Sequence, residues 1–348
     1  MSKFNNSARL QNLDYLRGIV AFGIMIFHYS WWVFGNEFKA DTFISRVGIY
    51  GVSIFYVLSG LTLFYVYNNK MDNTFKDFFF FAKKRFFRIF PLLWIVTFLS
   101  ILLAWKVPNL KNLFLNLTGL FGFVKWNVYF STGVWSIGNE IVFYFFFPFF
   151  LFLNKYNKYL LIVIGLIIFF LYVYFAFDVL DSNITLSKQW KNYTNPLNQL
   201  FLFFGGFIIG KTYINSNINN KINISLILFS LLLFCVYPVD GDRINLVTGF
   251  NRIVFTFCSF LVCLSFFKFN YSLPKIFDSP FSFLGEASYS IYLLHPIIYK
   301  IVDVFSDDFF QFSNFFKVFV SVFLTILISY FSYNYFEKYF IKLGVKKY

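Results

Sequence analysis

Residues 15–34, YLRGIVAFGIMIFHYSWWVF, decide the fold of this chain. A helix of about 20 apolar residues is about 30 Å long, which matches the hydrocarbon thickness of a bilayer. The stretch does not end like a cleavable signal, because it continues through Trp31 and Trp32 without a small-residue cleavage site. We count about ten apolar runs long enough to cross a membrane. They lie near 15–34, 48–67, 89–106, 133–153, 159–179, 196–213, 224–239, 246–267, 286–304 and 315–336.

The composition of the whole chain agrees with this pattern. Of 348 residues, 59% are hydrophobic and only 13% are charged, whereas soluble domains are about a quarter charged. No long hydrophilic stretch interrupts the runs. The sequence therefore predicts an all-α polytopic membrane protein with about ten transmembrane helices. We expect one transmembrane domain over residues 1–348 with no appended soluble domain. The three cysteines have neither metal-ligand nor CxxC spacing, so we expect no metal site.

The basic residues predict the orientation of these helices. The formal net charge is +14, but the basic residues sit in short clusters between apolar runs, where they favour anionic lipid rather than nucleic acid. Roughly 19 Lys and Arg fall in the connections on the side of the N-terminus and about 11 on the other side. Short basic loops are retained in the cytoplasm. We therefore expect both termini to be cytoplasmic and the number of spans to be even.

The first run contains two ionisable side chains on one face. His28 lies deep in the apolar stretch, and Arg17 precedes it by eleven residues. Eleven residues are about three helical turns, so both side chains project from one face about 16 Å apart. Ionisable groups inside a span are costly and often functional. The alternative is that His28 makes a helix–helix hydrogen bond and Arg17 extends to the lipid headgroups.

Two other spans carry charged residues of the same kind. Arg85 and Arg88 are neighbours on a helix that enters the bilayer, where two guanidinium groups can clamp phosphates. An ordinary positive-inside anchor is the alternative. Glu140 lies about two turns inside the fourth span, so its carboxylate must face the protein interior or a water-filled cavity. It is a candidate partner for an arginine or a histidine.

Small and polar residues of the second and ninth spans have structural explanations. Ser53 and Ser59 suit close helix packing. His295 precedes Pro296, which frees a backbone carbonyl, so a structural hydrogen bond and a chemical role are equally plausible there.

These motifs together resemble the integral-membrane acyltransferase family 3, whose members O-acylate bacterial surface and exported glycans. The resemblance covers nearly the whole chain in the order of the family. It is carried by Leu13–Gly18 followed by His28, by Gly51–Gly60, by Arg85–Trp94, by Trp135–Tyr144 and by Ser288–Pro296. Two departures are visible: Ile141 stands where the family often has a second acid after Glu140, and Ser53 stands where it often has an acid.

The resemblance implies a reaction and roles for the motif residues. Acyl transfer from a thioester needs a base, donors for an oxyanion and positive charge for the phosphates of the donor. His28 is then the general base or a transient acyl carrier, Arg17, Arg85 and Arg88 bind cytoplasmic acyl-CoA, and Glu140 orients His28 or meets the sugar. The supporting residues are Trp135, Ser136, Ser288, Tyr289 and His295.

The same resemblance implies the setting of the reaction. We expect a bacterial cytoplasmic membrane, acetyl as the commonest acyl group, a glycan acceptor and no permanently bound cofactor. Some family members carry a C-terminal esterase-like domain that this sequence lacks up to Tyr348. The chain is then expected to deliver the acyl group itself or to pass it to a separate periplasmic or extracellular protein. The competing functions are a transporter or flippase for lipid-linked sugars, which predicts internal repeats, and a structural partner in a glycan-synthesis complex.

Overall fold

The computed structural model of the chain describes residues 3–35, 38–72, 74–270 and 273–346, with the side chains of 3–10 and 309 excepted. These residues form helices and no strands. The α-helices are α1 (Lys3–Phe34), α2 (Phe43–Tyr67), α3 (Phe75–Ala104), α4 (Leu110–Thr118), α5 (Phe121–Val124), α6 (Val134–Tyr156), α7 (Lys158–Tyr174), α8 (Trp190–Tyr193), α9 (Pro196–Tyr213), α10 (Asn220–Val236), α11 (Gly249–Lys268), α12 (Lys275–Glu286), α13 (Ser288–Phe305), α14 (Asn314–Phe331) and α15 (Lys338–Val345). Short π and 3₁₀ turns are η2 (Phe175–Val179), η3 (Arg243–Leu246), η4 (Ser306–Phe310) and η5 (Ser332–Glu337).

Each of the ten predicted spans overlaps a long helix, which confirms an all-α polytopic membrane protein. By length and apolar composition, seven helices of the described residues are able to cross a membrane. The helices of the three remaining predicted spans, α9, α10 and α13, do not meet this criterion. Helix α10 is apolar but has only 17 residues. Helices α9 and α13 are less apolar because they bury polar side chains such as Asn198, Ser290 and His295 in the protein interior. Polar side chains within a span face other helices and not lipid.

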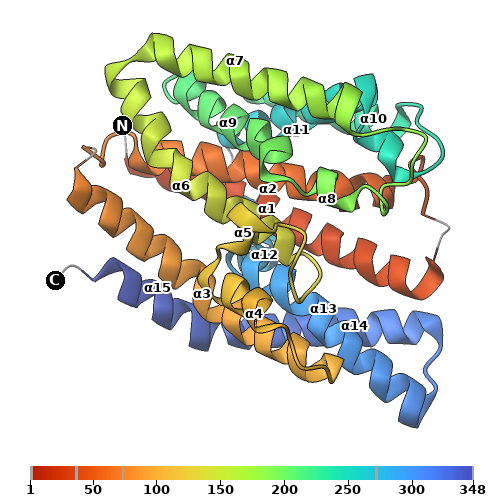
Figure 1. Cartoon of the computed structure of the whole chain (residues 1–348). Coiled ribbons are helices and arrows are strands. Elements are labelled where there is room, and N and C mark those ends of the chain that lie inside the picture. Colours follow the sequence, from red (N-terminus) through yellow and green to blue (C-terminus); the bar gives the residue numbers. More distant parts are fainter. Residues whose placement is uncertain (1–2, 36–37, 73, 271–272, 347–348) are drawn as a thin grey trace.

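The long helices run in the same general direction and form one bundle (Figure 1). The N-terminus and the C-terminus both lie at the left end of the bundle in Figure 1, as an even number of spans requires. We call this end the termini side. The assignment of the termini side to the cytoplasm stays a prediction from the distribution of Lys and Arg.

The third span begins earlier than the hydropathy predicts. Helix α3 starts at Phe75 because Thr74 and Asp77 form a capping box, in which each side chain accepts from the backbone of the other residue. The helix then continues through the basic stretch into the apolar run. Arg85 and Arg88 therefore lie within a regular helix, one turn apart on one face.

Helices α2 and α9 cross at two glycines. A Cβ atom added to Gly60 would lie 2.0 Å from the carbonyl oxygen of Phe203, and one added to Gly206 would lie 2.0 Å from that of Val57. The two backbones therefore touch, as at other crossings of membrane helices through small residues. Ser53 of α2 is buried as well, in agreement with its predicted packing role.

Arg46 fixes the first turn of α2 to the end of α10. Its guanidinium donates hydrogen bonds to the carbonyl oxygens of Ala40 at 3.1 Å, Phe234 at 2.7 Å, Cys235 at 2.9 Å and Tyr237 at 2.8 Å. The side chain is 2% exposed. A buried cation here satisfies carbonyls that have no partner within α10 and complements the negative end of its dipole.

We expect Arg46→Met to lower the midpoint of thermal unfolding of the purified protein in detergent. The substitution leaves several buried carbonyls without a donor, at a cost of about 1–3 kcal/mol for each group that stays unsatisfied. Lys125→Met is the control, because Lys125 is exposed. Equal midpoints for the two variants would show that Arg46 does not stabilise this junction.

Candidate active site

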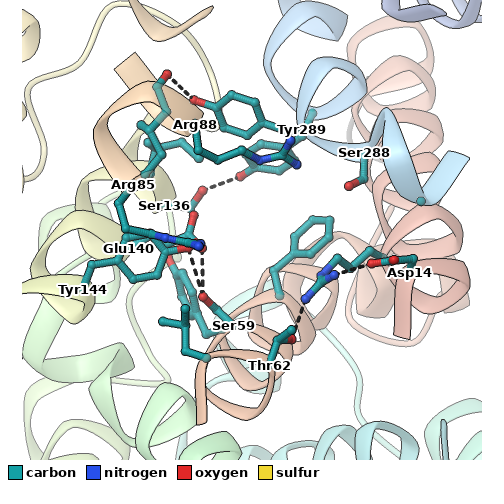
Figure 2. A pocket seen from close by; sticks show the side chains of 18 of the residues that line it. Asp14, Ser59, Thr62, Arg85, Arg88, Ser136, Glu140, Tyr144, Ser288 and Tyr289 are labelled. Carbon is teal, nitrogen blue, oxygen red and sulfur yellow. Dashed lines mark hydrogen bonds and ion pairs between the residues drawn. The ribbon is translucent and has the colours of Figure 1, made fainter. Parts of the chain in front are cut away.

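A cavity of about 440 Å³ opens between α1, α2, α3, α6, α12 and α13. Figure 2 shows the cavity with Asp14 and Thr62 on one side and Glu140 and Tyr144 across from them. It contains most of the polar residues that the sequence singles out. The charged and polar lining residues are Asp14, Arg17, Tyr56, Ser59, Thr62, Tyr67, Arg85, Arg88, Ser136, Glu140, Tyr144, Glu286, Ser288, Tyr289, Tyr292 and Tyr333.

Arg17 enters the cavity from α1. Its guanidinium forms an ion pair with Asp14, one turn earlier on the same helix, and donates a hydrogen bond to the hydroxyl of Thr62 on α2. The Arg17 side chain is 25% exposed. Arg17 therefore faces the polar interior and is fixed on both sides, which argues against a side chain that only extends to lipid headgroups.

The two arginines of α3 reach the same cavity with different partners. Arg88 lies 3.5 Å from the Glu337 carboxylate and 5.6 Å above the ring of Tyr289. Arg85 stacks on Tyr144 at 5.5 Å and has no carboxylate ion pair in the described part of the chain. Its buried Nε atom has no hydrogen-bond partner there either. Arg85 thus has charge and donor capacity left for an anionic ligand.

Glu140 lies in the wall formed by α6. One of its oxygens accepts hydrogen bonds from the hydroxyls of Ser59, at 2.9 Å, and Tyr144. Ser59 is therefore a cavity residue, which corrects its prediction as a packing residue. The pairing of Glu140 with His28 is not observed, because the hydrogen-bond partners of Glu140 are on α2 and α6, while His28 bonds to α13.

Helix α13 supplies the inner wall of the cavity. The Tyr289 hydroxyl donates to the carbonyl of Ile89 on α3 at 2.7 Å, and the Tyr292 hydroxyl lies 2.8 Å from that of Ser136 on α6. Ser288 also lines the cavity. The supporting residues Ser136, Ser288 and Tyr289 predicted from the sequence are thus brought to the arginines.

The two histidines form a pair beyond the cavity. Nδ1 of His28 is 2.9 Å from Nε2 of His295, and neither residue is among those that line the cavity. The link is Tyr292, which lines the cavity and whose ring centroid is 6.0 Å from that of His295. Because His28 is about three turns beyond Arg17 on α1, the histidine pair lies deeper in the bundle than the arginines.

Trp135 is the predicted site residue that the structure places elsewhere. It is 5% exposed and packs against Trp190 and Tyr193, with ring centroids 5.5 Å and 5.6 Å away. It does not line the cavity. Trp135 and Ser136 are adjacent in the first turn of α6, so their side chains point to different sides and only Ser136 faces the cavity.

A family model described as an acyltransferase domain matches residues 10–334, nearly the whole chain. This chain belongs to the acyltransferase family 3. It is a multi-pass membrane acyltransferase, and the match gives no support to the transporter alternative. No curated protein and no solved structure matches this chain.

A second cavity of the acyltransferase lies beside the first. It has a volume of about 530 Å³ and is lined mainly by phenylalanines of α3, α5 and α6. Arg85, Ile89 and Tyr144 line both cavities. Arg85 of the acyltransferase therefore separates a polar chamber from an apolar one.

Glu337, which pairs with Arg88 in the acyltransferase, was not predicted from the sequence. Glu337 is 3% exposed, accepts a hydrogen bond from Ser290 and lies in η5. The rule that found Glu140, a carboxylate next to an apolar run, applies equally to Glu337 at the end of the last run. Glu337 is the last residue of the π-turn η5, and such a turn has no simple pattern in the sequence.

Proposed function

We propose that this acyltransferase moves an acyl group, most commonly acetyl, from cytoplasmic acyl-CoA to a hydroxyl of an exported or cell-surface glycan in a bacterial cytoplasmic membrane. One observation carries the proposal. The arginine-lined cavity and the histidine pair share Tyr292 as a common boundary. A donor held by the arginines would thus extend towards the imidazole that performs the transfer.

The cavity suits the head of acyl-CoA. Arg17, Arg85 and Arg88 face one space, and guanidinium groups bind phosphates in a bidentate manner. Asp14 and Glu337 compensate Arg17 and Arg88, so Arg85 offers the strongest uncompensated attraction. The second oxygen of Glu140 has no hydrogen-bond partner among the described residues, and it is an acceptor for an amide N–H of the pantetheine arm.

His28 suits the transfer step. A neutral imidazole takes the proton from the acceptor hydroxyl while the hydroxyl oxygen attacks the thioester carbonyl. The tetrahedral intermediate then breaks its C–S bond, and the CoA thiolate leaves with the proton that His28 took from the hydroxyl, which returns His28 to its neutral form. His28 is partly exposed whereas His295 is fully buried, so His28 is the ring that an acceptor can reach. Transient acylation of His28 is the two-step form of the same reaction.

Mass spectrometry of surface glycans tests this function in cells. The glycans of the wild type are compared with those of a deletion strain and of strains that carry the intact gene or His28→Ala. The proposal predicts that a labile ester mass is lost equally from the deletion and His28→Ala strains and returns with the intact gene. An ester that persists while glycan export fails would contradict the proposal and indicate a transporter.

We expect Glu337→Gln to raise the KM for acyl-CoA about tenfold with little change in kcat. Glutamine retains a hydrogen-bond acceptor for Ser290 but removes the charge that orients Arg88, and a charge-assisted contact contributes about 1.5–3 kcal/mol. We expect the loss of a fixed Arg88 orientation to outweigh the gain in uncompensated positive charge. The measurement is donor-dependent initial rates with the purified protein. Asp303→Asn is the control, since it removes a carboxylate that pairs with Lys317 outside the cavity. An unchanged KM in Glu337→Gln would show that Glu337 does not contribute to donor binding.

A further inference from the structure

The chain contains only two histidines, and the structure joins them. Nδ1 of His28 on α1 and Nε2 of His295 on α13 are 2.9 Å apart. Their rings are nearly parallel, with an interplanar angle of 14° and centroids 5.0 Å apart. At this distance one nitrogen must carry a hydrogen and the other a lone pair.

A backbone carbonyl fixes which nitrogen donates. Nδ1 of His295 lies 3.1 Å from the carbonyl oxygen of Ile291. Pro296 lacks the N–H that would bond to the Tyr292 carbonyl. A carbonyl oxygen only accepts hydrogen bonds, so Nδ1 of His295 carries a hydrogen. In a neutral ring Nε2 of His295 is then an acceptor.

The hydrogen therefore lies on Nδ1 of His28, and the lone pair of His28 is on Nε2. This Nε2 atom has no hydrogen-bond partner among the described residues. A positively charged ring in the pair is disfavoured, because no carboxylate in the described ranges is ion-paired with either histidine. It would also be repelled by the cation Arg243, which lies 4.4 Å above the ring of Trp31 on α1.

Neighbouring aromatic residues hold the two rings in this orientation. Trp32 stacks on His28 with centroids 5.2 Å apart and an interplanar angle of 12°. The Tyr29 hydroxyl donates to the carbonyl oxygen of His295 at 2.9 Å. The donor Nδ1 of His295 is fixed by a carbonyl, and the planes of both rings are fixed by stacking. Together these contacts define the tautomers.

We propose that His295 is a positioning residue that fixes His28 in the tautomer protonated at Nδ1, with Nε2 as the atom that takes the proton of the acceptor. The tautomer follows from the geometry alone. The use of Nε2 in transfer rests on the function proposed above.

Nitrogen NMR tests the tautomer directly. The protein is labelled with histidine that carries ¹⁵N only in its ring and is purified through a tag without histidine, so that only the four ring nitrogens of His28 and His295 appear. Spectra of His295→Gln assign the signals of His28. We expect both Nδ1 atoms protonated and both Nε2 atoms unprotonated. A hydrogen on Nε2 of His28 in the intact protein would overturn the proposal.

Two substitutions of His295 test the positioning role. Gln places an oxygen that accepts from Nδ1 of His28, whereas Leu offers no acceptor. We expect His295→Leu to lower kcat about 10–100-fold, as for other residues that orient a functional histidine, with the KM for acyl-CoA unchanged. His295→Gln should restore most of kcat. Equal kcat values for the two variants, or a change confined to KM, would contradict the role.

The two tests separate this proposal from the proposed function. If the tautomers are as expected and no glycan is acylated, the function is wrong while the tautomer stands. If glycans are acylated and Nε2 of His28 carries the hydrogen, the function stands and the positioning role is wrong. Should His295→Leu fail to fold, the NMR result and the activity of His295→Gln decide.

Discussion

Replacement of His28 by alanine is expected to lower kcat for acyl transfer about 10²–10⁴-fold, the usual contribution of a general base. The KM for acyl-CoA should stay close to that of the intact enzyme, because His28 does not line the arginine cavity. The measurement is initial rates with purified protein, acyl-CoA and an extract of surface glycan.

Ser30→Ala is the matched control for His28→Ala. Ser30 is partly exposed on the same helix, two residues further on, and should be replaceable without loss of rate. A His28→Ala enzyme that transfers at the rate of Ser30→Ala would remove His28 from the mechanism. Acid-quenched samples of intact enzyme that retain an acyl group on His28 would support the two-step form.

Arg85→Met is expected to weaken acyl-CoA binding about 10–100-fold. Arg85 has no ion-pair partner among the described residues. Its charge is therefore available to a phosphate. Loss of one or more charge-assisted hydrogen bonds, about 1.5–3 kcal/mol each, gives an effect of this size. Isothermal titration with CoA measures it without any transfer reaction.

Lys76→Met is the control for Arg85→Met. It removes one positive charge from the exposed start of the same helix, so it separates binding in the cavity from general attraction to a basic surface. Equal losses of affinity for the two variants would place the phosphates outside the cavity. A loss of CoA affinity that is confined to Arg85→Met should also depend less on the salt concentration than a loss caused by a surface charge.

The fold was predictable because apolar length determines membrane spans. Runs such as 15–34 and 315–336 have no stable alternative to a helix in lipid, where backbone groups must bond within the segment. The start of α3 was not predictable from hydropathy, because a capping box starts the helix well before the apolar run. The short helices α4, α5 and α8 lie between spans and have no comparable pattern.

Part of the site was predictable from the cost of charge inside the membrane. That rule found Arg17, Arg85, Arg88 and Glu140, which line one cavity. Their partners were not predictable, because contacts between α3 and η5 or between α2 and α6 depend on helix rotation. Ser59 and Trp135 show this most clearly. A small residue of α2 proved to bond Glu140, and an aromatic neighbour of Ser136 proved to pack away from the cavity.

The partnership of His28 with His295 illustrates the same limit. The sequence places both residues in apolar helices and leaves a structural bond and a chemical role open for each. The structure shows that the two side chains meet in one contact. His295 bonds to a backbone carbonyl through one nitrogen and to His28 through the other, so the structural bond and the positioning role proposed above involve the same ring.

The most direct test of the account is a structure of the protein bound to a non-transferable acyl-CoA analogue. We predict the diphosphate of the analogue beside Arg85, with Arg17 and Arg88 in the same cavity, and the thioether end directed past Tyr292 towards His28. An analogue bound outside the cavity, or with its acyl end directed away from the histidine pair, would contradict the account.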